Sequence, residues 1–384
     1  MQLTKGQENG LKIAVERFKN KEPYTVIAGY AGTGKSTLIP YIVEALNIPE
    51  EQVMFATLTG KAALVLRNKG CQNAMTLHKL LYIPKKVPNS DEVEFVPRET
   101  LEGSPSLIVV DEASMVSKEI FDLLLTHKVH IIFLGDTFQL PAISESANIL
   151  DNPHVMLTEI TRQALDSPII RLSMDIREGK PLNFGGPKEA RIMPKNKVSQ
   201  GLLLGADIVL CARNDTRRGL NDKVRKLKWG DKYREGPIDG DRLICLHNYW
   251  KITDTNNESP LLNGLIGNIS KITIKETKAL HPKLTGMFID DVGNVFSRNK
   301  FNIDYKLLTK GELTVNNENW RDFYRVRKPL EFDYGYVVTT WKAQGSQWDK
   351  VLIFEEDFPY DKETHAKFLY TSVTRASEKC VLVR

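Results

Sequence analysis

A glycine-rich loop near the start of the chain restricts the choice of fold more than any other part of the sequence. The loop reads Gly29-Tyr-Ala-Gly-Thr-Gly34-Lys35-Ser36 and matches the pattern G-x-x-x-x-G-K-[ST]. The apolar residues 24–28 before it predict a buried strand, and residues 35–46 predict a helix. In that context backbone N–H groups surround phosphates, Lys35 reaches the β- and γ-phosphates, and the Ser36 hydroxyl binds Mg²⁺. We therefore expect a nucleotide site on an α/β sheet; the alternative is a glycine-rich turn with this spacing by chance.

Short apolar runs and helical patterns continue to alternate after the loop. We expect strands at residues 53–56, 107–111 and 129–134, with helices at residues 60–68 and 117–125. Strands separated by helices of this length favour a parallel sheet that is covered on both faces.

A second α/β pattern begins near residue 207. It predicts strands at residues 207–212, 335–339, 351–354 and 380–383, and helices at residues 215–228 and 364–373. Residues 241–329 interrupt this pattern with short strands and turns, which indicate a small β insertion.

These patterns predict an α/β protein with two parallel-sheet domains. We expect the first domain at residues 1–165, the second at residues 166–240 and 330–384, and a β-barrel-like insertion at residues 241–329. Three prolines and the alternation of Val93 and Phe95 predict a projecting hairpin within residues 82–104 of the first domain. A plain surface loop is the alternative for that segment.

Composition excludes several classes of protein. The 384 residues are 41% hydrophobic and 26% charged, which argues against a disordered chain or a collagen-like repeat. A formal net charge of +5 permits a nucleic-acid partner without identifying one. No apolar run approaches the ~18 residues of a membrane helix, and the N-terminus lacks the apolar core of a secretory signal. We expect a protein of the bacterial or phage-infected cytoplasm that does not contact membranes.

Two motifs after later strands add chemistry to the loop. Asp111 and Glu112 follow a buried strand, so Asp111 can hold Mg²⁺ and Glu112 can orient and deprotonate an attacking water. Gln139 follows the next strand and can contact both the γ-phosphate and that water. Each motif alone has a plain structural explanation as a strand cap or a turn.

Together the motifs resemble those of superfamily-one helicases, in particular the branch of RecD and Dda. The resemblance is carried by Gln7, residues 29–37, Ala56-Thr-Leu-Thr-Gly-Lys-Ala-Ala63, Thr76-Leu-His78, Asp111-Glu-Ala-Ser-Met115, Gly135-Asp-Thr-Phe-Gln-Leu-Pro141, Leu157-Thr-Glu-Ile-Thr-Arg-Gln163, Thr339-Thr-Trp-Lys-Ala-Gln-Gly-Ser-Gln-Trp348 and Leu369-Tyr-Thr-Ser-Val-Thr-Arg-Ala376. The resemblance implies two RecA-like P-loop NTPase domains and ATP-driven 5′→3′ movement on single-stranded DNA.

The resemblance also assigns residues to the ATP site. It implies that Arg162 and Arg375 reach the γ-phosphate, Arg375 from the second domain, and that Gln7 contacts the adenine. The remaining residues expected to bind nucleotide are Gly32, Thr33, Gly34, Lys35, Ser36, Thr37 and Gly345. The expected cofactors are ATP and Mg²⁺, with Ser36 and Asp111 as metal ligands.

A strand of DNA is expected to cross the tops of both domains. The family positions that contact it are Thr57, Thr59, Lys61, His78, Thr340, Trp341 and Lys342. Trp341 departs from the histidine that is common in the family, and its ring offers stacking on a base instead. Phe95 is a candidate stacking residue on the hairpin, which we interpret as a wedge for the duplex. Basic tracts at residues 213–234 and 320–328 fit strand binding or a solvated face.

Several partners and roles stay open at this stage. The expected partners are single-stranded DNA and junctions of single- and double-stranded DNA, with replication or single-strand-binding proteins as candidates, and we expect a monomer. Replication, recombination and repair are equally compatible with the motifs, as is unwinding of RNA or hybrids. The alternative functions are a P-loop ATPase or small-molecule kinase that does not translocate, and a catalytically silent nucleic-acid-binding protein.

Overall fold

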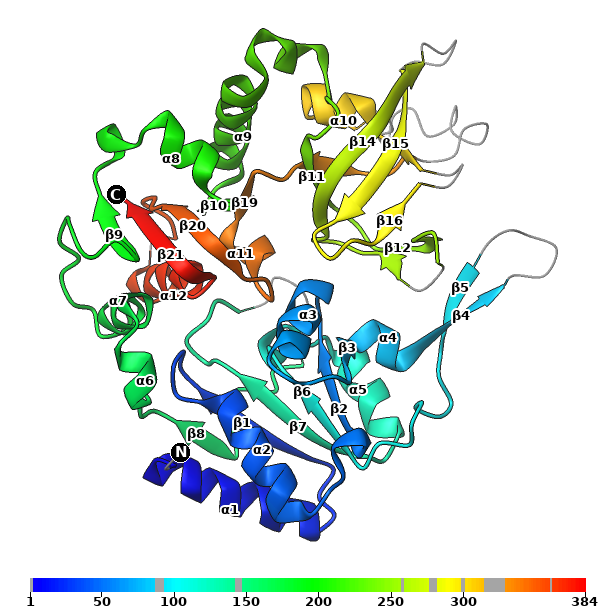
Figure 1. Ribbon diagram of the computed structural model, residues 1–384, viewed down its shortest axis with the longest axis vertical. Coiled ribbons are helices and arrows are strands. Elements are labelled where there is room, and N and C mark those ends of the chain that lie inside the picture. The colour runs from blue at the N-terminus through cyan, green and yellow to red at the C-terminus, as the bar shows by residue number, and fades with distance from the viewer. Residues whose placement is uncertain are drawn as a thin grey trace.

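The computed structural model describes residues 3–86, 93–141, 147–256, 259–275, 282–297, 301–313, 329–359 and 361–384 (Figure 1). Two features expected from the sequence, the hairpin turn at residues 87–92 and the basic tract at residues 320–328, lie outside the described residues. In Figure 1 two units built on parallel sheets lie one above the other, and an antiparallel sheet lies beside the upper unit.

The lower unit, called the first unit below, contains the glycine-rich loop. Its parallel strands lie in the order β3 (Ala74–Thr76), β2 (Val53–Thr57), β6 (Leu107–Val110), β7 (His130–Gly135), β1 (Tyr24–Gly29) and β8 (Val155–Leu157). The associated helices are α1 (Lys5–Lys19), α2 (Lys35–Leu46), α3 (Gly60–Asn68), α4 (Leu77–Leu81) and α5 (Lys118–Thr126). Alternate residues of β6 belong to different apolar clusters, because both faces of the sheet are covered.

A second parallel sheet forms the upper unit, called the second unit below. Its strands lie in the order β19 (Val337–Thr339), β10 (Ile208–Cys211), β20 (Trp348–Phe354), β21 (Ala376–Val383) and β9 (Ala190–Met193). The helices of this part are α6 (Arg162–Leu165), α7 (Pro168–Arg177), α8 (Gln200–Gly205), α9 (Asn214–Trp229), α11 (Thr340–Ala343) and α12 (Lys362–Val373). Two parallel sheets with helices on their faces confirm the expected α/β class with two RecA-like domains.

The β insertion is an antiparallel sheet with its own core. Its strands lie in the order β16 (Val295–Phe296), β15 (Lys283–Asp290), β14 (Ile266–Lys275), β11 (Arg242–Cys245) and β18 (Phe332–Tyr334), with β17 (Asn302–Ile303) also on β15. Beside it lie β12 (Tyr249–Thr253), β13 (Pro260–Leu261) and α10 (Tyr305–Lys310). The rings of Phe288, Phe301 and Phe332 pack together in the centre. The last strand, β18, follows residue 329, where the sequence suggested that the insertion ends; barrel-like closure stays a prediction.

The expected hairpin consists of β4 (Tyr82–Lys86) and β5 (Val93–Pro97), which pair antiparallel with Tyr82 opposite Pro97. Figure 1 shows it extending from the lower unit toward β12 of the insertion. In the described part of the chain, no helix is both long and apolar enough to span a bilayer.

Candidate nucleotide site and nucleic-acid surface

The glycine-rich loop joins β1 to α2, and its glycines are required by the backbone. Gly32 and Gly34 have positive φ angles of 80° and 76°, which only glycine adopts without strain. A Cβ on Gly34 would also lie 2.4 Å from the Nε2 atom of Gln7. Lys35 starts α2, and its ammonium donates to the carbonyl oxygens of Gly29 and Tyr30 at 2.7 and 3.0 Å. The lysine is therefore held over the loop.

Gln7 supports the loop from α1. Its buried side chain donates to the carbonyl oxygen of Thr33 at 3.1 Å and accepts from the backbone N–H of Thr4 at 2.9 Å. Thr4 caps α1 in return, so the helix start fixes the glutamine amide. Thr33 is buried, whereas Ser36 and Thr37 are exposed on the first turn of α2.

Asp111 and Glu112 follow β6 at the same edge of the sheet. Burial is the main cause that raises the pKa of Asp111 to about 6; the neighbouring Glu112 adds to this and the charge of Lys35 opposes it. The Oδ1 atom of Asp111 accepts from the N–H of Glu112 at 2.9 Å. Glu112 has a left-handed backbone with φ of 57°, a conformation that costs a non-glycine residue about 1 kcal/mol.

Arg375 crosses from the second parallel sheet to these carboxylates. It follows α12, and only 4% of its side chain is exposed. Its Nη1 atom lies 3.4 Å from the Oε1 atom of Glu112 and 3.4 Å from the carbonyl oxygen of Ser346. The structure therefore brings the expected second-domain cation to the expected base.

Arg162 lies beside the loop but is exposed at the start of α6. The preceding residue, Thr161, donates its backbone N–H to the carbonyl oxygen of Gly32 at 2.9 Å. A Cβ on Gly32 would meet Ala164 and Ile170, so this segment packs directly against the loop. Arg162 is thus near the phosphate-binding backbone.

Residues 136–140, which include Gln139, are hydrogen-bonded to residues of the second unit. The backbone N–H of Leu140 donates to the Thr371 hydroxyl at 2.9 Å, and its carbonyl oxygen accepts from Gln344 at 2.5 Å. Gln139 itself is 9% exposed, and its buried Oε1 atom has no hydrogen-bond partner within the described residues. Such an orphaned acceptor is free for a ligand.

Residues 56–63, the motif of the first unit that is expected to contact DNA, also contact Gly345 of the second unit. The Thr59 hydroxyl caps α3 and donates to the carbonyl oxygen of Gly345 at 2.6 Å. Gly345 has a φ of 70°, and a Cβ there would lie 3.4 Å from Thr59. Thr57 is buried beneath, with its hydroxyl donating to the carbonyl oxygen of Thr59 at 2.9 Å. Gly345 therefore lies at the contact between the two halves.

His78 and Phe95 belong to an aromatic cluster that the sequence did not reveal. The ring of Trp250, on β12 of the insertion, lies 5.0 Å from His78, 5.7 Å from Tyr82 and 6.2 Å from Phe95. Burial lowers the pKa of His78 to about 4, so the imidazole is neutral at pH 7. His78 can stack or hydrogen-bond, but it does not attract phosphate by charge.

The residues of the second unit that are expected to contact DNA, Thr340, Trp341 and Lys342, are all at least half-buried. Thr340 is 0% exposed, and its hydroxyl lies 2.7 Å from the Ser372 hydroxyl inside the domain. Trp341 is half-buried, with its ring 6.3 Å from Phe368. Lys342 is half-buried, and burial lowers its pKa. The structure thus turns the Thr340 hydroxyl into the core, which argues against the expected strand contact by that atom.

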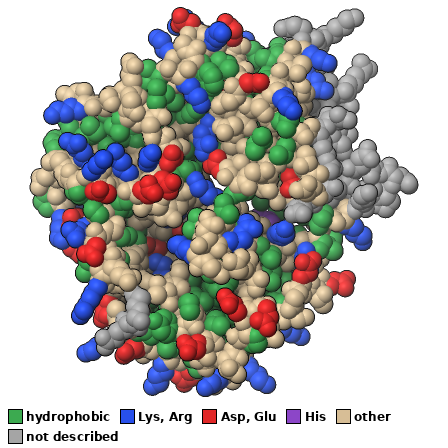
Figure 2. Space-filling view, viewed as in Figure 1, with side chains coloured by type: hydrophobic (Ala, Val, Ile, Leu, Met, Phe, Trp, Pro, Cys, Tyr) green, Lys and Arg blue, Asp and Glu red, His purple; other side chains and the backbone are tan. Residues whose placement is uncertain are grey.

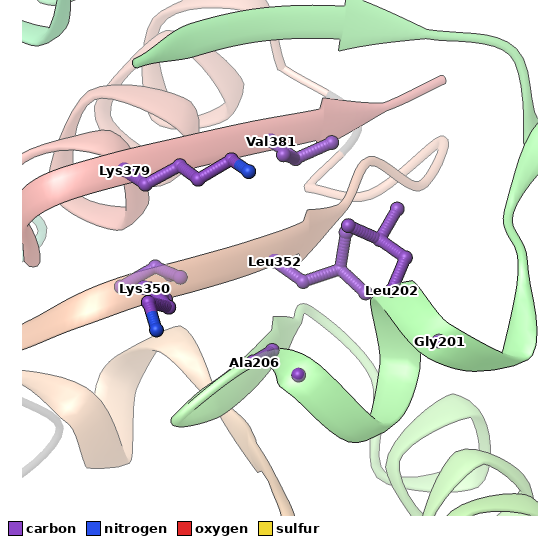
Figure 3. A pocket seen from close by; sticks show the side chains of 9 residues that line it. Gly201, Leu202, Ala206, Lys350, Leu352, Lys379 and Val381 are labelled. Atoms are coloured by element: carbon purple, nitrogen blue, oxygen red, sulfur yellow. The ribbon is translucent and has the colours of Figure 1, made fainter. Parts of the chain in front are cut away.

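The surface between the two parallel-sheet units is hollowed. Figure 2 shows this hollow with basic and acidic side chains along its edges. A separate cavity of about 220 Å³ lies between α8 and the strands β20 and β21 of the second sheet. Figure 3 shows Leu202 of α8 beside Leu352 of β20; Ala206, the residue after α8, and Lys379 of β21 also line this cavity. None of the expected site residues lines this cavity.

Comparisons with known proteins agree with this arrangement. Residues 2–190 match a family model described as an AAA domain, and residues 334–383 match a UvrD-like helicase C-terminal domain. Over 192 residues the chain is 31% identical to the ATP-dependent DNA helicase dda of Enterobacteria phage T4, covering 46% of this chain and 43% of that protein. Over 389 residues it is 27% identical to the ATP-dependent RecD2 DNA helicase of Deinococcus radiodurans, covering 92% and 46%.

The fold comparison covers the whole chain. A structure of Pif1 helicases at forked double-stranded DNA matches with a TM-score of 0.50 and 18% identity, covering 100% of this chain and 92% of that one. The chain spans less than half the length of the two named relatives above. The two family models, these relatives and the shared fold together support a superfamily-one helicase of the RecD, Dda and Pif1 branch.

Proposed function

We propose that this protein is an ATP-dependent DNA helicase that moves 5′→3′ on single-stranded DNA. The observation that carries the proposal is the contact between Arg375 and Glu112, which joins the two parallel-sheet units beside the phosphate loop. Both named relatives are described as ATP-dependent DNA helicases. We assign residues 1–165 and residues 166–240 with 330–384 to the two motor domains, and residues 241–329 to the insertion, whose sheet is completed by β18 from the start of the last segment.

ATP and Mg²⁺ fit the residues around the loop. The Ser36 hydroxyl is exposed at the helix start, and Asp111 lies at the end of β6 within the electrostatic influence of Lys35. Hydroxyl and carboxylate oxygens are ligands that Mg²⁺ prefers, together with phosphate oxygens. Bound with the nucleotide, Mg²⁺ would neutralise phosphate charge. Gly32, Gly34 and Thr37 supply backbone N–H groups, and Gln7, which supports the loop through Thr33, is the proposed contact to the base.

Hydrolysis would use side chains from both units. Glu112 orients and deprotonates the attacking water. Gln139 offers its unpartnered Oε1 atom to that water and reports on the γ-phosphate. Lys35, Arg162 and Arg375 stabilise the charge that develops in the transition state, which is the main requirement of phosphoryl transfer. Because Arg375 comes from the second unit, nucleotide binding closes the hollow and hydrolysis relaxes it.

Single-stranded DNA and forked DNA are the proposed partners. Thr59, Lys61 and Lys342 contact phosphates, which gives binding without base recognition. His78, Phe95 and Trp341 offer aromatic surfaces for bases. Thr57 and Thr340 shape the surface from below, since their hydroxyls are turned inward. A replication or single-strand-binding protein is the proposed protein partner.

The test measures ATP turnover and unwinding together. We expect single-stranded DNA to stimulate turnover, and only forks with a 5′ single-stranded tail to be unwound. Lys35→Ala removes the phosphate-binding cation and is expected to lower turnover by about 100-fold or more, whereas Lys12→Ala on the exposed face of α1 leaves it unchanged. An ATP turnover rate that single-stranded DNA does not change would indicate an ATPase or kinase that does not translocate. Faster unwinding of forks with a 3′ tail than of forks with a 5′ tail would overturn the proposed polarity. Unwinding rates on RNA forks and on RNA–DNA hybrid forks show whether the substrate is restricted to DNA.

A further inference from the structure

Tyr370 joins the two parallel-sheet units at the phosphate loop. It lies on α12 of the second unit and is 1% exposed. Its hydroxyl accepts the backbone N–H of Ala31 at 2.7 Å and donates to the Oδ2 atom of Asp136 at 2.6 Å. Both partners belong to the first unit: Ala31 is in the loop, and Asp136 follows β7. A single hydroxyl thus binds the loop and the segment that carries Gln139.

The local environment keeps this hydroxyl in place. Burial is the main cause that raises the pKa of Tyr370 far above its ordinary value, and the charge of Asp136 acts in the same direction, so the hydroxyl stays protonated. The Phe138 ring contacts the tyrosine ring edge-on at 5.1 Å. Asp136 also accepts the backbone N–H of Phe138 at 3.0 Å, and it is 3% exposed. Loss of the hydroxyl would leave the N–H of half-buried Ala31 and a carboxylate oxygen of buried Asp136 without this partner.

The same helix carries the arginine that enters the site. Arg375 lies just after the end of α12 and donates through Nε to the carbonyl oxygen of Thr371 at 3.2 Å. Thr371 accepts from Leu140, so Tyr370 and its neighbour hold both ends of residues 136–140. The position of the loop relative to Arg375 therefore depends on one rigid helix end and its contacts.

We propose that Tyr370 is a positioning residue for ATP hydrolysis, because its bridge from Ala31 to Asp136 sets how far Arg375 reaches into the nucleotide site. The inference rests on the proposed function. Ala31 lies before the backbone N–H groups of residues 32–37 that the loop offers to phosphates. The bridge therefore influences the geometry of hydrolysis without taking a nucleotide contact.

The experiment is a double-mutant cycle on DNA-stimulated ATP turnover. Tyr370→Phe keeps the ring and removes the hydroxyl. Asp136→Asn removes the charge and leaves one oxygen where the two carboxylate oxygens accept separately from the Tyr370 hydroxyl and the Phe138 N–H, so the bridge from Tyr370 loses its own acceptor. We expect each to lower kcat by about tenfold while KM for ATP changes by less than about threefold. The double variant should be little worse than either single variant, because both remove one interaction. Tyr336→Phe is the matched control, since it removes the hydroxyl of a half-buried tyrosine that also donates to an aspartate, Asp241, away from the loop.

The outcomes separate this inference from the proposed function. A wild-type chain without DNA-stimulated turnover would overturn both. If the wild type is active and Tyr370→Phe retains its kcat, the bridge proposal alone is wrong. A kcat loss in Tyr370→Phe matched by the Tyr336→Phe control, or multiplicative effects of Tyr370→Phe and Asp136→Asn, would show a general packing role and also overturn it. If Tyr370→Phe does not fold, Asp136→Asn alone decides, by its split between kcat and KM.

Discussion

Lys61 lies where three parts of the chain meet. Its ammonium is 4.5 Å from the centre of the Trp348 ring of the second unit, and the neighbouring Gly60 lies against Val292 of the insertion. Burial is the main cause that lowers its pKa to about 8; Arg242 adds to this, and Asp291, Asp207 and Asp349 oppose it. This lysine is therefore the proposed phosphate contact whose charge changes nearest to physiological pH.

Binding of single-stranded DNA should weaken as Lys61 loses its proton. Between pH 7 and pH 9 we expect the wild type to lose severalfold more affinity than Lys61→Arg, whose guanidinium stays charged. Fluorescence anisotropy with a labelled oligonucleotide at fixed salt measures this. Lys342, whose pKa is also lowered, is present in both proteins and cancels.

Unfolding does not explain such a loss. The pKa of Lys61 in the folded chain lies below its ordinary value of 10.5, so the unfolded chain binds more protons between about pH 8 and 10.5. This group alone therefore makes the fold more stable as pH rises through that range. Equal pH dependence of the two proteins would contradict a phosphate contact by Lys61.

At the scale of residues, the sequence predicts a site only where spacing reports geometry. Lys35 and Asp111 follow strands that meet at one sheet edge, so local pattern was sufficient to place them together. Trp250 and Tyr370 have no local motif that reveals their partners, because His78 and Ala31 are brought to them by packing between units. The burial of Thr340 was equally hidden, since its hydroxyl partner lies on another helix.

At the scale of elements, the hairpin β4–β5 rests on the insertion. Trp250 of β12 contacts rings from α4, β4 and β5, so both strands of the hairpin are supported by the insertion. A segment that separates strands must resist the force of the duplex, and this cluster supplies such support. The hairpin as a wedge stays a prediction.

Trp250→Ala should separate unwinding from hydrolysis. Removing the indole forfeits aromatic contacts of about 0.5–1.5 kcal/mol each, so we expect a clear loss of unwinding rate on 5′-tailed forks. Turnover stimulated by single-stranded DNA should stay near the wild-type value, because the rings that Trp250 contacts are those of His78, Tyr82 and Phe95 and not residues of the phosphate loop. Trp250→Phe keeps a ring and serves as the control. Equal losses in both activities would reject a wedge supported by Trp250.

The strands of the parallel sheets were the most predictable elements. Residues 53–56 and 351–354 were recognised because fully buried parallel strands are continuous apolar runs. The helix α1 was not predicted, although the capping pair Thr4 and Gln7 was a readable signal. Residues 335–339 were expected as a strand, and β19 occupies Val337–Thr339 of this range. The separate strand β18 ends just before it at Tyr334, because the chain passes there from one sheet to the other.

At the scale of the whole molecule, one buried ion pair fixes the insertion to the second unit. Arg225 of α9 lies 3.0 Å from Asp241, and their side chains are 4% and 0% exposed. Asp241 also accepts from Trp229 and Tyr336, and the Arg225 guanidinium lies over the Tyr334 ring at 3.7 Å. These residues surround the points where the chain enters and leaves the insertion, so the two parts should move as one body.

Asp241→Asn should loosen this junction. It leaves Arg225 buried without a charged partner, which costs about 3–5 kcal/mol and should lower the melting temperature of this part of the chain by roughly 5–10 °C. Scanning calorimetry measures the shift, and Asp231→Asn on the nearby exposed turn is the matched control. An unchanged melting temperature would show that the junction is held by other contacts.

The interruption of the second sheet has a consequence for synthesis of the chain. Val209 of β10 pairs with Val337 on one side and with Leu352 on the other, both of which follow the whole insertion. The first sheet is complete once β8 has left the ribosome, whereas β10 must wait with both edges unpaired while the insertion is made. Unpaired strand edges are sites of misassociation. The early-folding first unit and the self-contained core of the insertion thus shorten the period in which most of the nascent chain is unprotected.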